Sequence, residues 1–367
     1  MRLIATCKLG LEAVVAMELR ALGFAELCVE DARVRFEGGL REMARACLWL
    51  RTAERVLLEV GSFAACSFEE LFEGVKSLPW KDYIARDAYI HVNGKSAKST
   101  LFSVSDCQSI VKKAIVENLL SAYQTSVIPE TGSEMIVEVG LLRDQATLAL
   151  DCCGAGLSRR GYRTYNVAAP LSETLGAAVA MLSRHKPEQP LIDPMCGSGT
   201  MPIEAAMIAQ NRAPGENRSF AFEVWPFFPL EMIKEERRAA ADSCRDDVKL
   251  NITGSDIDAR SIELCKRHAK KAGVMLKWHV QPLSELSTQE SGGVILCNPP
   301  YGERMMKRGE AEKLYRQMRQ TFDGLAGWKV NIIAAHPGFE RIYGKRADKR
   351  RKLSNGGMPC TLYQYFK

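Results

Sequence analysis

An acid followed by a glycine turn is the first feature of this chain that could do chemistry. Two apolar residues precede Asp193, and residues 194–200 read Pro-Met-Cys-Gly-Ser-Gly-Thr. Gly197 and Gly199 allow the backbone to bend sharply and a ligand to approach it closely. Residues 201–208 read as a helix, and the free N–H groups at its start favour an anionic group. Because Asp193 would face a cation, the stretch fits a ligand with both a carboxylate and an ammonium, such as an amino acid.

Glycine turns of this kind open many doubly wound sheets, so the first stretch alone is weak evidence for a ligand site. A second polar stretch, farther along the chain, strengthens the interpretation. Residues 294–297 predict a buried strand, which stops at Asn298, Pro299, Pro300 and Tyr301. The two prolines end strand pairing and stiffen the chain. They would hold an amide, a backbone carbonyl and an aromatic ring at the carboxyl end of the strand, the usual ligand side of an open α/β sheet.

The two stretches, in this order, resemble motifs one and four of the class I S-adenosylmethionine-dependent amino-methyltransferases. The resemblance implies S-adenosylmethionine as the cofactor and no metal. It assigns the cofactor to the glycine turn and to residues that follow neighbouring strands, namely Asp193, Met195, Cys196, Gly197, Ser198, Gly199, Thr200, Asp256, Ile257, Gln281 and Asn298.

Two of these assignments leave alternatives open. Asp256 follows a predicted strand and suits the two hydroxyls of a ribose, but Asp258 competes for that role and otherwise caps the next helix. The family often has an acid after the third strand for the adenine amine, whereas Gln281 stands there in this chain. The adenine contact is therefore left to Gln281 or to backbone groups.

The resemblance also implies the reaction, which is methylation of an exocyclic amine on a planar base. The Asn298 side-chain oxygen and the Pro299 carbonyl would each accept one amine N–H and stabilise the charge that grows on the nitrogen. Tyr301 would stack on a base flipped out of its helix. The methyl group of a sulfonium is already activated, so alignment of the reacting atoms is the main catalytic term.

Three other residues near these stretches have a chemical and a structural interpretation. Cys297 suggests covalent attack on a pyrimidine, but its place in an apolar strand favours a buried, inert thiol. Cys196 is expected to be a small packing residue beside the cofactor. His336 follows a predicted strand and is assigned a structural rather than a catalytic role.

Positive charge is concentrated near the end of the chain. The net charge is +6, and residues 301–367 hold 15 Lys and Arg against 6 Asp and Glu. Basic residues cluster at 341–352 and again at 159–163, which predicts contact with nucleic-acid phosphates. The residues expected to contact RNA are Arg159, Arg160, Arg163, Lys349, Arg350, Arg351 and Lys352. For the cluster at 341–352 the alternative is a solvated surface, and for the cluster at 159–163 it is a hinge.

The bulk composition is that of a soluble globular protein in a reducing compartment. The chain has 367 residues, of which 46% are hydrophobic and 26% charged. No stretch approaches the roughly 18 apolar residues of a membrane helix, and the N-terminus does not read as a signal peptide. The 12 cysteines of the chain form no Cys-x-x-Cys pair, so free thiols in the cytoplasm are expected. The oligomeric state is not determined, and a monomer is the simpler expectation.

The order of predicted helices and strands divides the chain into three folded parts. Residues 1–60 predict a ferredoxin-like α+β unit. Residues 61–155 resemble a THUMP domain, an RNA-binding module, in the segment 99–115 and in a final hairpin. Residues 156–168 are a linker rich in glycine and arginine, and the resemblance implies that residues 169–367 form a Rossmann-like methyltransferase domain with a mostly parallel seven-stranded sheet.

Further stretches resemble the large-subunit ribosomal RNA guanine methyltransferases that carry a THUMP domain. They are Arg-Gly-Tyr-Arg at 160–163, Ala-Pro-Leu-x-Glu at 169–173 and the ending at 353–363. The resemblance implies methylation of a guanine N2 amine in 23S ribosomal RNA. The alternatives are the same reaction on transfer RNA, adenine methylation of DNA, glutamine methylation of a release factor, and an inactive RNA-binding assembly factor.

One insertion in the last domain has no assigned role. Residues 210–249 separate the first helix of this domain's sheet from its second strand, and they contain an aromatic cluster at 220–228. Aromatic side chains can stack on bases, but they also fill cores and form lids. The sequence leaves these alternatives open.

Overall fold

The computed structural model describes residues 1–163, 171–300 and 308–366, and it divides the chain into two compact units. The first unit comprises Met1–Thr6, Ala16–Leu157 and Ser219–Arg238. The second comprises Cys7–Val15, Ser158–Arg218 and Ala239–Lys367. Part of the predicted insertion therefore belongs to the first unit, although it lies within the sequence of the methyltransferase domain.

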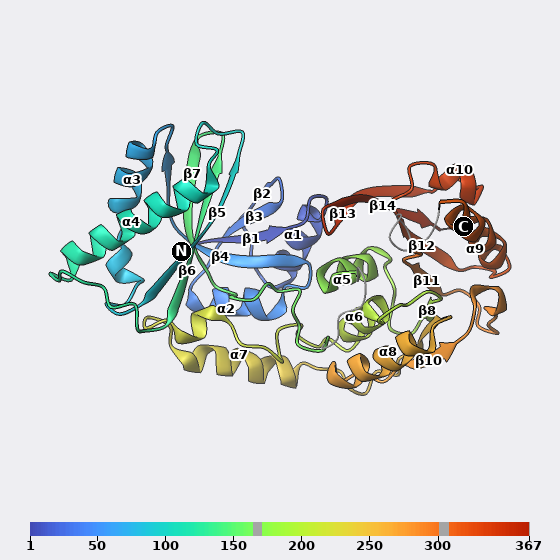
Figure 1. Cartoon of the computed structure of the whole chain (residues 1–367). Helices are drawn as coiled ribbons and strands as arrows, with labels where there is room; N and C mark the ends of the chain where they lie inside the picture. Colours follow the sequence, from blue (N-terminus) through green and yellow to red (C-terminus); the bar gives the residue numbers. More distant parts are fainter. Residues whose placement is uncertain (164–170, 301–307, 367) are drawn as a thin grey trace. The chain divides into compact units, whose positions relative to one another are not determined.

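A seven-stranded mixed sheet forms the first unit (Figure 1). Its strand order is β2-β3-β1-β4-β7-β6-β5, in which β5 and β6 are parallel. The strands are β1 (Arg2–Cys7), β2 (Leu27–Glu30), β3 (Arg33–Glu37), β4 (Ala53–Ala64), β5 (Tyr89–Ala97), β6 (Glu134–Leu142) and β7 (Gln145–Asp151). The boundary predicted at residue 60 falls inside β4, so the ferredoxin-like and THUMP-like parts share one continuous sheet.

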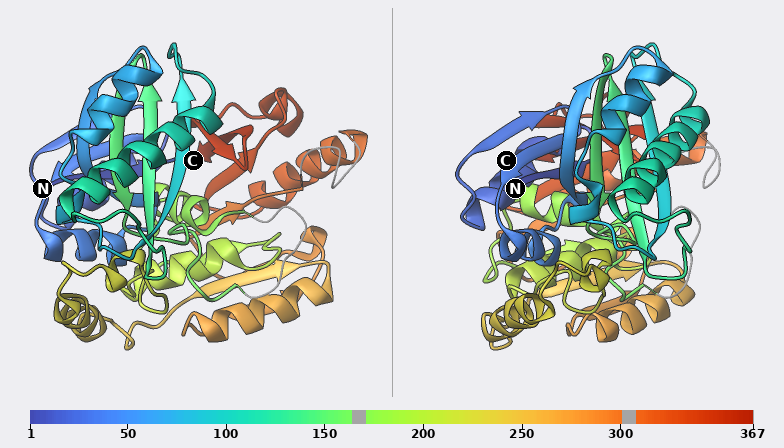
Figure 2. Two further views of the ribbon diagram at one scale, coloured as in Figure 1. Left: turned by 60° about the vertical axis from the view of Figure 1, so that its left-hand side comes forward. Right: turned by 90° about the vertical axis from the view of Figure 1, so that its left-hand side faces the viewer.

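The hairpin that joins β6 to β7 follows from its two turn residues. Arg143 and Asp144 have φ angles of +52° and +61°, and a turn with two positive φ values matches the twist of paired strands. Figure 2 shows α3 and α4 against one face of the neighbouring strands. The helices that lie wholly or mostly in this unit are α1 (Glu12–Ala21), α2 (Leu40–Trp49), α3 (Phe68–Lys76), α4 (Val104–Ala122) and α7 (Leu230–Asp242), with short 3₁₀ turns at Trp80–Asp82 and Ala221–Val224.

The aromatic cluster of the insertion is mainly packing. Phe220, Phe222, Trp225 and Phe228 are buried, and the rings of Phe222 and Phe228 lie 4.6 Å apart between centroids. The Phe222 N–H donates to the carbonyl of Cys152, at the end of the first unit's sheet. These four rings are therefore not available as a base-stacking surface.

The second unit is built on a seven-stranded sheet of order β10-β9-β8-β11-β12-β14-β13. The first five strands in this order are parallel, and β14 is antiparallel to both β12 and β13. This confirms the predicted mostly parallel Rossmann-like sheet. The strands are β8 (Leu191–Asp193), β9 (Ile252–Asp256), β10 (Lys277–Val280), β11 (Val294–Cys297), β12 (Lys329–Ala334), β13 (Lys349–Asn355) and β14 (Met358–Tyr365).

Helices cover this sheet, and its core is apolar. Ile295, Cys297, Tyr315 and Phe339 are fully buried in one cluster. The helices are α5 (Glu173–Leu182), α6 (Thr200–Ala209), α8 (Ala259–Lys271), α9 (Arg308–Asp323) and α10 (Phe339–Tyr343), with a 3₁₀ turn at Leu283–Glu285. No helix among the described residues is long and apolar enough to cross a membrane.

Candidate active site

The predicted site residues come together at the carboxyl ends of three adjacent strands. Asp193 ends β8, Asp256 ends β9 on one side of it, and Asn298 directly follows β11 on the other side. Because all three strands are parallel, these ends meet at one edge of the sheet, as expected for a ligand site in an open α/β fold.

The glycine turn after β8 has the backbone conformation that its sequence predicts. Gly197 and Gly199 have φ angles of +52° and +83°, which residues with a side chain rarely adopt. A Cβ atom at Gly199 would lie only 2.9 Å from the Trp278 ring, whereas one at Gly197 would meet no atom of the described residues within 4 Å. Gly199 is thus required for packing, and the backbone at Gly197 borders open space that a ligand can approach.

Asp256 holds the glycine turn from the neighbouring strand. Its two carboxylate oxygens accept hydrogen bonds from the N–H groups of Gly197, at 3.0 Å, and Asp258, at 2.9 Å. Asp258 accepts from the N–H of Arg260 at 2.9 Å and caps α8. The capping role considered for Asp258 is therefore confirmed, and Asp256 is the acid that faces the turn.

Two buried oxygen atoms at this edge lack partners. Asp193 Oδ1 accepts from the N–H of Met195 at 3.2 Å. Asp193 Oδ2 and Asn298 Oδ1 are buried, and neither has a hydrogen-bond partner among the residues that the structure describes. Burial raises the pKa of Asp193 well above its usual range, and the charge of Asp256 raises it further. Orphaned acceptors of this kind call for a donor, and the ammonium of an amino acid and the N–H of an amine would supply one.

The other predicted cofactor residues surround the turn. Ile257 is 75% exposed, and the N–H of Gln281 donates to the Asp256 carbonyl at 3.1 Å. Cys196 is buried, and its sulfur lies 3.8 Å from that of Cys265. Ser198 and Thr200 are also buried. Trp278, which belongs to neither sequence motif, packs against the turn from β10.

The structure does not favour the alternative chemistry at Cys297 or His336. Cys297 is fully buried in β11, and burial raises the pKa of its thiol well above the usual range, so the thiolate is disfavoured. His336 Nδ1 accepts from the N–H of Gly338 at 3.0 Å, just before α10, which is a structural role. Tyr301 lies outside the described residues.

The prediction that Arg160 and Arg163 contact RNA is wrong. The Arg160 side chain is 1% exposed and forms an ion pair with Glu204. Arg163 is largely buried and donates to Thr200 Oγ1 at 2.6 Å. Both guanidinium groups are therefore engaged inside the second unit. Arg159 is exposed, and its contact with RNA stays a prediction.

The basic run near the end of the chain forms β13, at the edge of the sheet. Lys349, Arg350 and Lys352 are exposed. Arg351 is half-buried and donates to the carbonyl of Gly10 at 2.9 Å, so it is partly committed to the fold. The turn that joins β13 to β14 consists of Gly356 and Gly357, both with positive φ.

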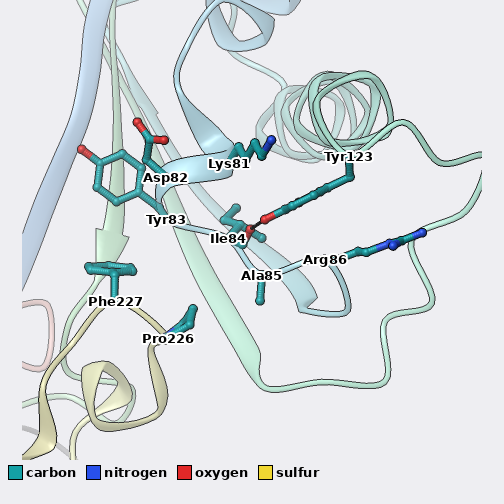
Figure 3. Close-up of a pocket in the computed structure, with 9 residues that line it drawn as sticks. All are labelled: Lys81, Asp82, Tyr83, Ile84, Ala85, Arg86, Tyr123, Pro226 and Phe227. Carbon is teal, nitrogen blue, oxygen red and sulfur yellow. Dashed lines mark hydrogen bonds between the residues drawn. The ribbon is translucent and has the colours of Figure 1, made fainter.

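The first unit contains an open cavity of about 400 Å³ next to the insertion (Figure 3). Tyr83 and Phe227 line it, with ring centroids 5.6 Å apart and the rings nearly perpendicular. Lys81 and Arg86 also line it, and Tyr123 donates its hydroxyl hydrogen to the Ile84 carbonyl. Aromatic rings next to cations are the groups that single-stranded RNA binds.

Comparison with known proteins assigns a family description to each part of the chain. Residues 160–364 match a model described as RMKL-like methyltransferase domain. Residues 2–57 match the RlmL ferredoxin-like domain, and residues 65–151 match the THUMP domain.

Similarity to whole proteins extends over nearly the entire chain. This chain is 44% identical to the "Putative RNA methyltransferase YpsC" of Bacillus subtilis, over 99% of its own length and 95% of that protein. It is 35% identical to the ribosomal RNA large subunit methyltransferase K/L of Aliivibrio fischeri, over 97% of this chain but only 52% of that protein. The crystal structure of SMU.472, complexed with SAH, superposes with a TM-score of 0.94 at 42% identity, covering 100% of this chain and 97% of that one.

Proposed function

Because this chain belongs to the RMKL-like methyltransferase family, we propose that it methylates the exocyclic N2 amine of a guanine in 23S ribosomal RNA. It is an S-adenosylmethionine-dependent RNA methyltransferase of the RlmK/L type with a THUMP domain. The ribosomal substrate rests on the Aliivibrio relative, of which the chain spans about half the length. We expect the protein to act in the cytoplasm.

The observation that carries the proposal is a pair of buried acceptors, at the ends of neighbouring strands, that have no partner among the described residues. Asp193 Oδ2 is positioned for the cofactor ammonium, and Asn298 Oδ1 for the amine that is methylated. The two oxygens follow β8 and β11, which pair directly in the sheet. One site therefore offers an acceptor to each of the two reactants.

The chain's own residues then bind and orient these reactants. The Asp193 carboxylate holds an ammonium, and Asp256 has lone pairs left for ribose hydroxyls beside its two backbone partners. Asn298 and the Pro299 carbonyl each accept one amine N–H and stabilise the positive charge that develops on the nitrogen. S-adenosylmethionine supplies the activated methyl group, and the amine releases its proton to solvent after the transfer.

We infer that RNA binds at exposed basic and aromatic positions in both units. Arg159, Lys349, Arg350 and Lys352 offer positive charge in the second unit. In the first unit, the cavity lined by Phe227 and its neighbours offers aromatic faces, and the THUMP match supports a role in RNA binding. Aromatic stacking contributes about 1–3 kcal/mol per base and phosphate contacts add a salt-dependent term.

A two-step experiment tests the proposal. Calorimetric titration with S-adenosylhomocysteine should give saturable binding without RNA, and the absence of heat from folded protein would exclude the proposed cofactor site. Methylation assays on 23S ribosomal RNA fragments, transfer RNA and DNA, followed by nucleoside mass spectrometry, should give N2-methylguanosine from the ribosomal fragments only. N2-methylguanosine from transfer RNA alone would move the substrate to transfer RNA, and N6-methyladenine in DNA would overturn the proposal.

A further inference from the structure

A buried ion pair ties the segment before the methyltransferase sheet to α6. Arg160 donates from Nε and Nη2 to the two carboxylate oxygens of Glu204, at 3.2 and 3.3 Å. The Tyr162 hydroxyl donates to the same carboxylate at 3.0 Å. All three side chains are buried. Three donors therefore converge on one residue in the first half of the helix that begins at the glycine turn.

Arg163 contacts the same helix at its first residue. Its Nη2 donates to Thr200 Oγ1 at 2.6 Å and to the Leu171 carbonyl at 2.8 Å. Its Nε lies 3.5 Å from the carboxylate of Glu173. Thr200 and Glu204 are four residues apart, so they lie on one face of α6, one turn above the other. The segment 160–163 thus runs along the N-terminal turn of α6.

The glycine turn itself is held from α8. His268 Nδ1 donates to the Ser198 carbonyl at 3.0 Å, and the Cys265 thiol donates to the Gly197 carbonyl at 3.1 Å. The Tyr162 ring lies next to His268, with 6.3 Å between the ring centroids. Burial lowers the pKa of His268, which keeps its ring neutral with one N–H to donate. The turn is therefore bounded by α8 and by the segment 160–163.

We propose that Arg160, Tyr162 and Arg163 are positioning residues, which set the place of the α6 N-terminus and thereby the shape of the cofactor turn. The inference rests on the proposed cofactor site. Glycines contribute little rigidity to the turn, so its shape depends on its hydrogen bonds to Asp256 and α8 and on the elements at its two ends. One end is β8, fixed in the sheet, and the other is the start of α6, which these side chains hold. A buried ion pair does not by itself indicate added stability. Its hydrogen bonds are directional, however, so they fix the relative positions of the two side chains.

Conservative variants separate positioning from general stabilisation. Arg163→Lys keeps the charge but replaces the guanidinium group whose Nη2 reaches both Thr200 and Leu171. Its matched control is Arg245→Lys, because Arg245 Nη2 donates at 2.8 Å to the carbonyl of Ala209, at the other end of α6. Arg163→Lys should weaken S-adenosylhomocysteine binding about tenfold, equivalent to about 1.4 kcal/mol. Arg245→Lys should leave the affinity within about twofold, although it alters a hydrogen bond to the same helix.

A second pair of variants tests the hydroxyl of Tyr162. Tyr162→Phe removes one hydrogen bond to Glu204 and keeps the ring, and it should weaken S-adenosylhomocysteine binding about fivefold. Tyr365→Phe also removes one hydrogen bond, to the Lys345 carbonyl, but contacts no part of the turn, and its affinity should not change. Single-turnover rates at saturating S-adenosylmethionine should stay within about twofold of wild type in all four variants, because the reacting groups are untouched.

The outcomes distinguish this inference from the proposed function. If the wild-type protein binds no S-adenosylhomocysteine, the cofactor site itself is wrong. If the wild type binds but Arg163→Lys and Tyr162→Phe bind as tightly, the site stands and the positioning role is overturned. Equal weakening in each variant and its control would also overturn it, because the effect would then follow stability. Selective weakening in Arg163→Lys and Tyr162→Phe supports it.

Discussion

Two fully buried carboxyl groups, one in each unit, differ in how their oxygens are satisfied. Glu18 in α1 accepts from the N–H groups of Arg51, at 2.7 Å, and Thr52, at 3.1 Å, and from the Thr52 hydroxyl. Asp193 in β8 accepts only from the N–H of Met195, and its other oxygen has no partner among the described residues. Burial raises the pKa of both groups. A carboxyl group with both oxygens hydrogen-bonded stabilises the fold around it, whereas one with an unpaired oxygen can accept a hydrogen bond from a ligand.

The same contrast occurs between two asparagines of adjacent strands. Asn331 in β12 is fully buried, donates to the Ile295 carbonyl at 3.3 Å and accepts from Gln364 at 2.9 Å. Asn298, just after β11, leaves its buried oxygen unpaired among the described residues. Asn331, inside the sheet, is thus satisfied within the protein, whereas Asn298, at the carboxyl edge, leaves one acceptor for a ligand. Substitutions at matched positions should separate stability from function.

The largest effect is expected at the asparagine pair. Asn298→Ala removes an unpaired acceptor and should lower the single-turnover methylation rate by roughly 10²–10³, the size of the effect when one preorganised donor or acceptor is removed from a developing charge. Its folding stability and cofactor affinity should be close to those of wild type. Asn331→Ala should instead cost about 1–3 kcal/mol of stability, because it removes one acceptor of Gln364 Nε2 and the side-chain donor to the Ile295 carbonyl. Full methylation activity in Asn298→Ala would place the chemistry elsewhere.

The next largest effect is expected for the two buried carboxyl groups, Asp193 and Glu18. Asp193→Asn keeps one acceptor but removes the charge, and S-adenosylhomocysteine affinity should fall by about 1.5–3 kcal/mol. Its thermal stability should be maintained or increased, since no hydrogen bond to Oδ2 is removed. Glu18→Gln places an NH₂ group against backbone donors and should lower Tm by several degrees without changing affinity. Titration calorimetry measures the affinity, and scanning calorimetry measures Tm. A loss of stability in Asp193→Asn would contradict the proposed difference between Asp193 and Glu18.

The raised pKa of Asp193 predicts a pH dependence with a definite sign. Without ligand, the folded state favours the protonated acid, so Asp193 contributes stability at low pH that is lost as the pH rises through its raised pKa. An ammonium favours the carboxylate, so ligand binding should release a proton. Cofactor affinity should therefore rise with pH and level off above the raised pKa, and Asp193→Asn should flatten this dependence. Titrations between about pH 5 and 8 in buffers of different ionisation enthalpy would show whether protons are released.

The smallest effect is expected on the basic edge strand, where interactions with RNA are exposed and screened. Replacement of Lys349, Arg350 and Lys352 by Gln should reduce the slope of log affinity against log salt by about 0.7–0.9 for each RNA phosphate that the variant no longer neutralises. Arg351 is left in place because it bonds to Gly10. The same three-charge change at Lys266, Lys270 and Lys271, exposed on α8, is the control. Equal slopes in the two triple variants would reduce β13 to a solvated surface.

The local sequence determined those features that depend on neighbouring residues. The conformation of Gly197 and Gly199 and the cap at Asp258 follow from residue types within a few positions. The alternation of apolar strands and helices predicted the parallel sheet, and with it the meeting of Asp193, Asp256 and Asn298 at one edge. These inferences held because backbone preference and hydrophobic period act over short distances.

Only the tertiary structure decided which polar side chains face inward. Arg159 and Arg160 are neighbours in a basic linker, yet one is exposed and the other pairs with Glu204, 44 positions away in the sequence. The aromatic insertion packs into the first unit, and one strand joins the two N-terminal parts into a single sheet. Burial and pairing depend on contacts between distant segments, which residue type and spacing do not specify. For the same reason, the sequence placed Asp193 at a strand end, but the fold determined that one of its oxygens has no partner among the described residues.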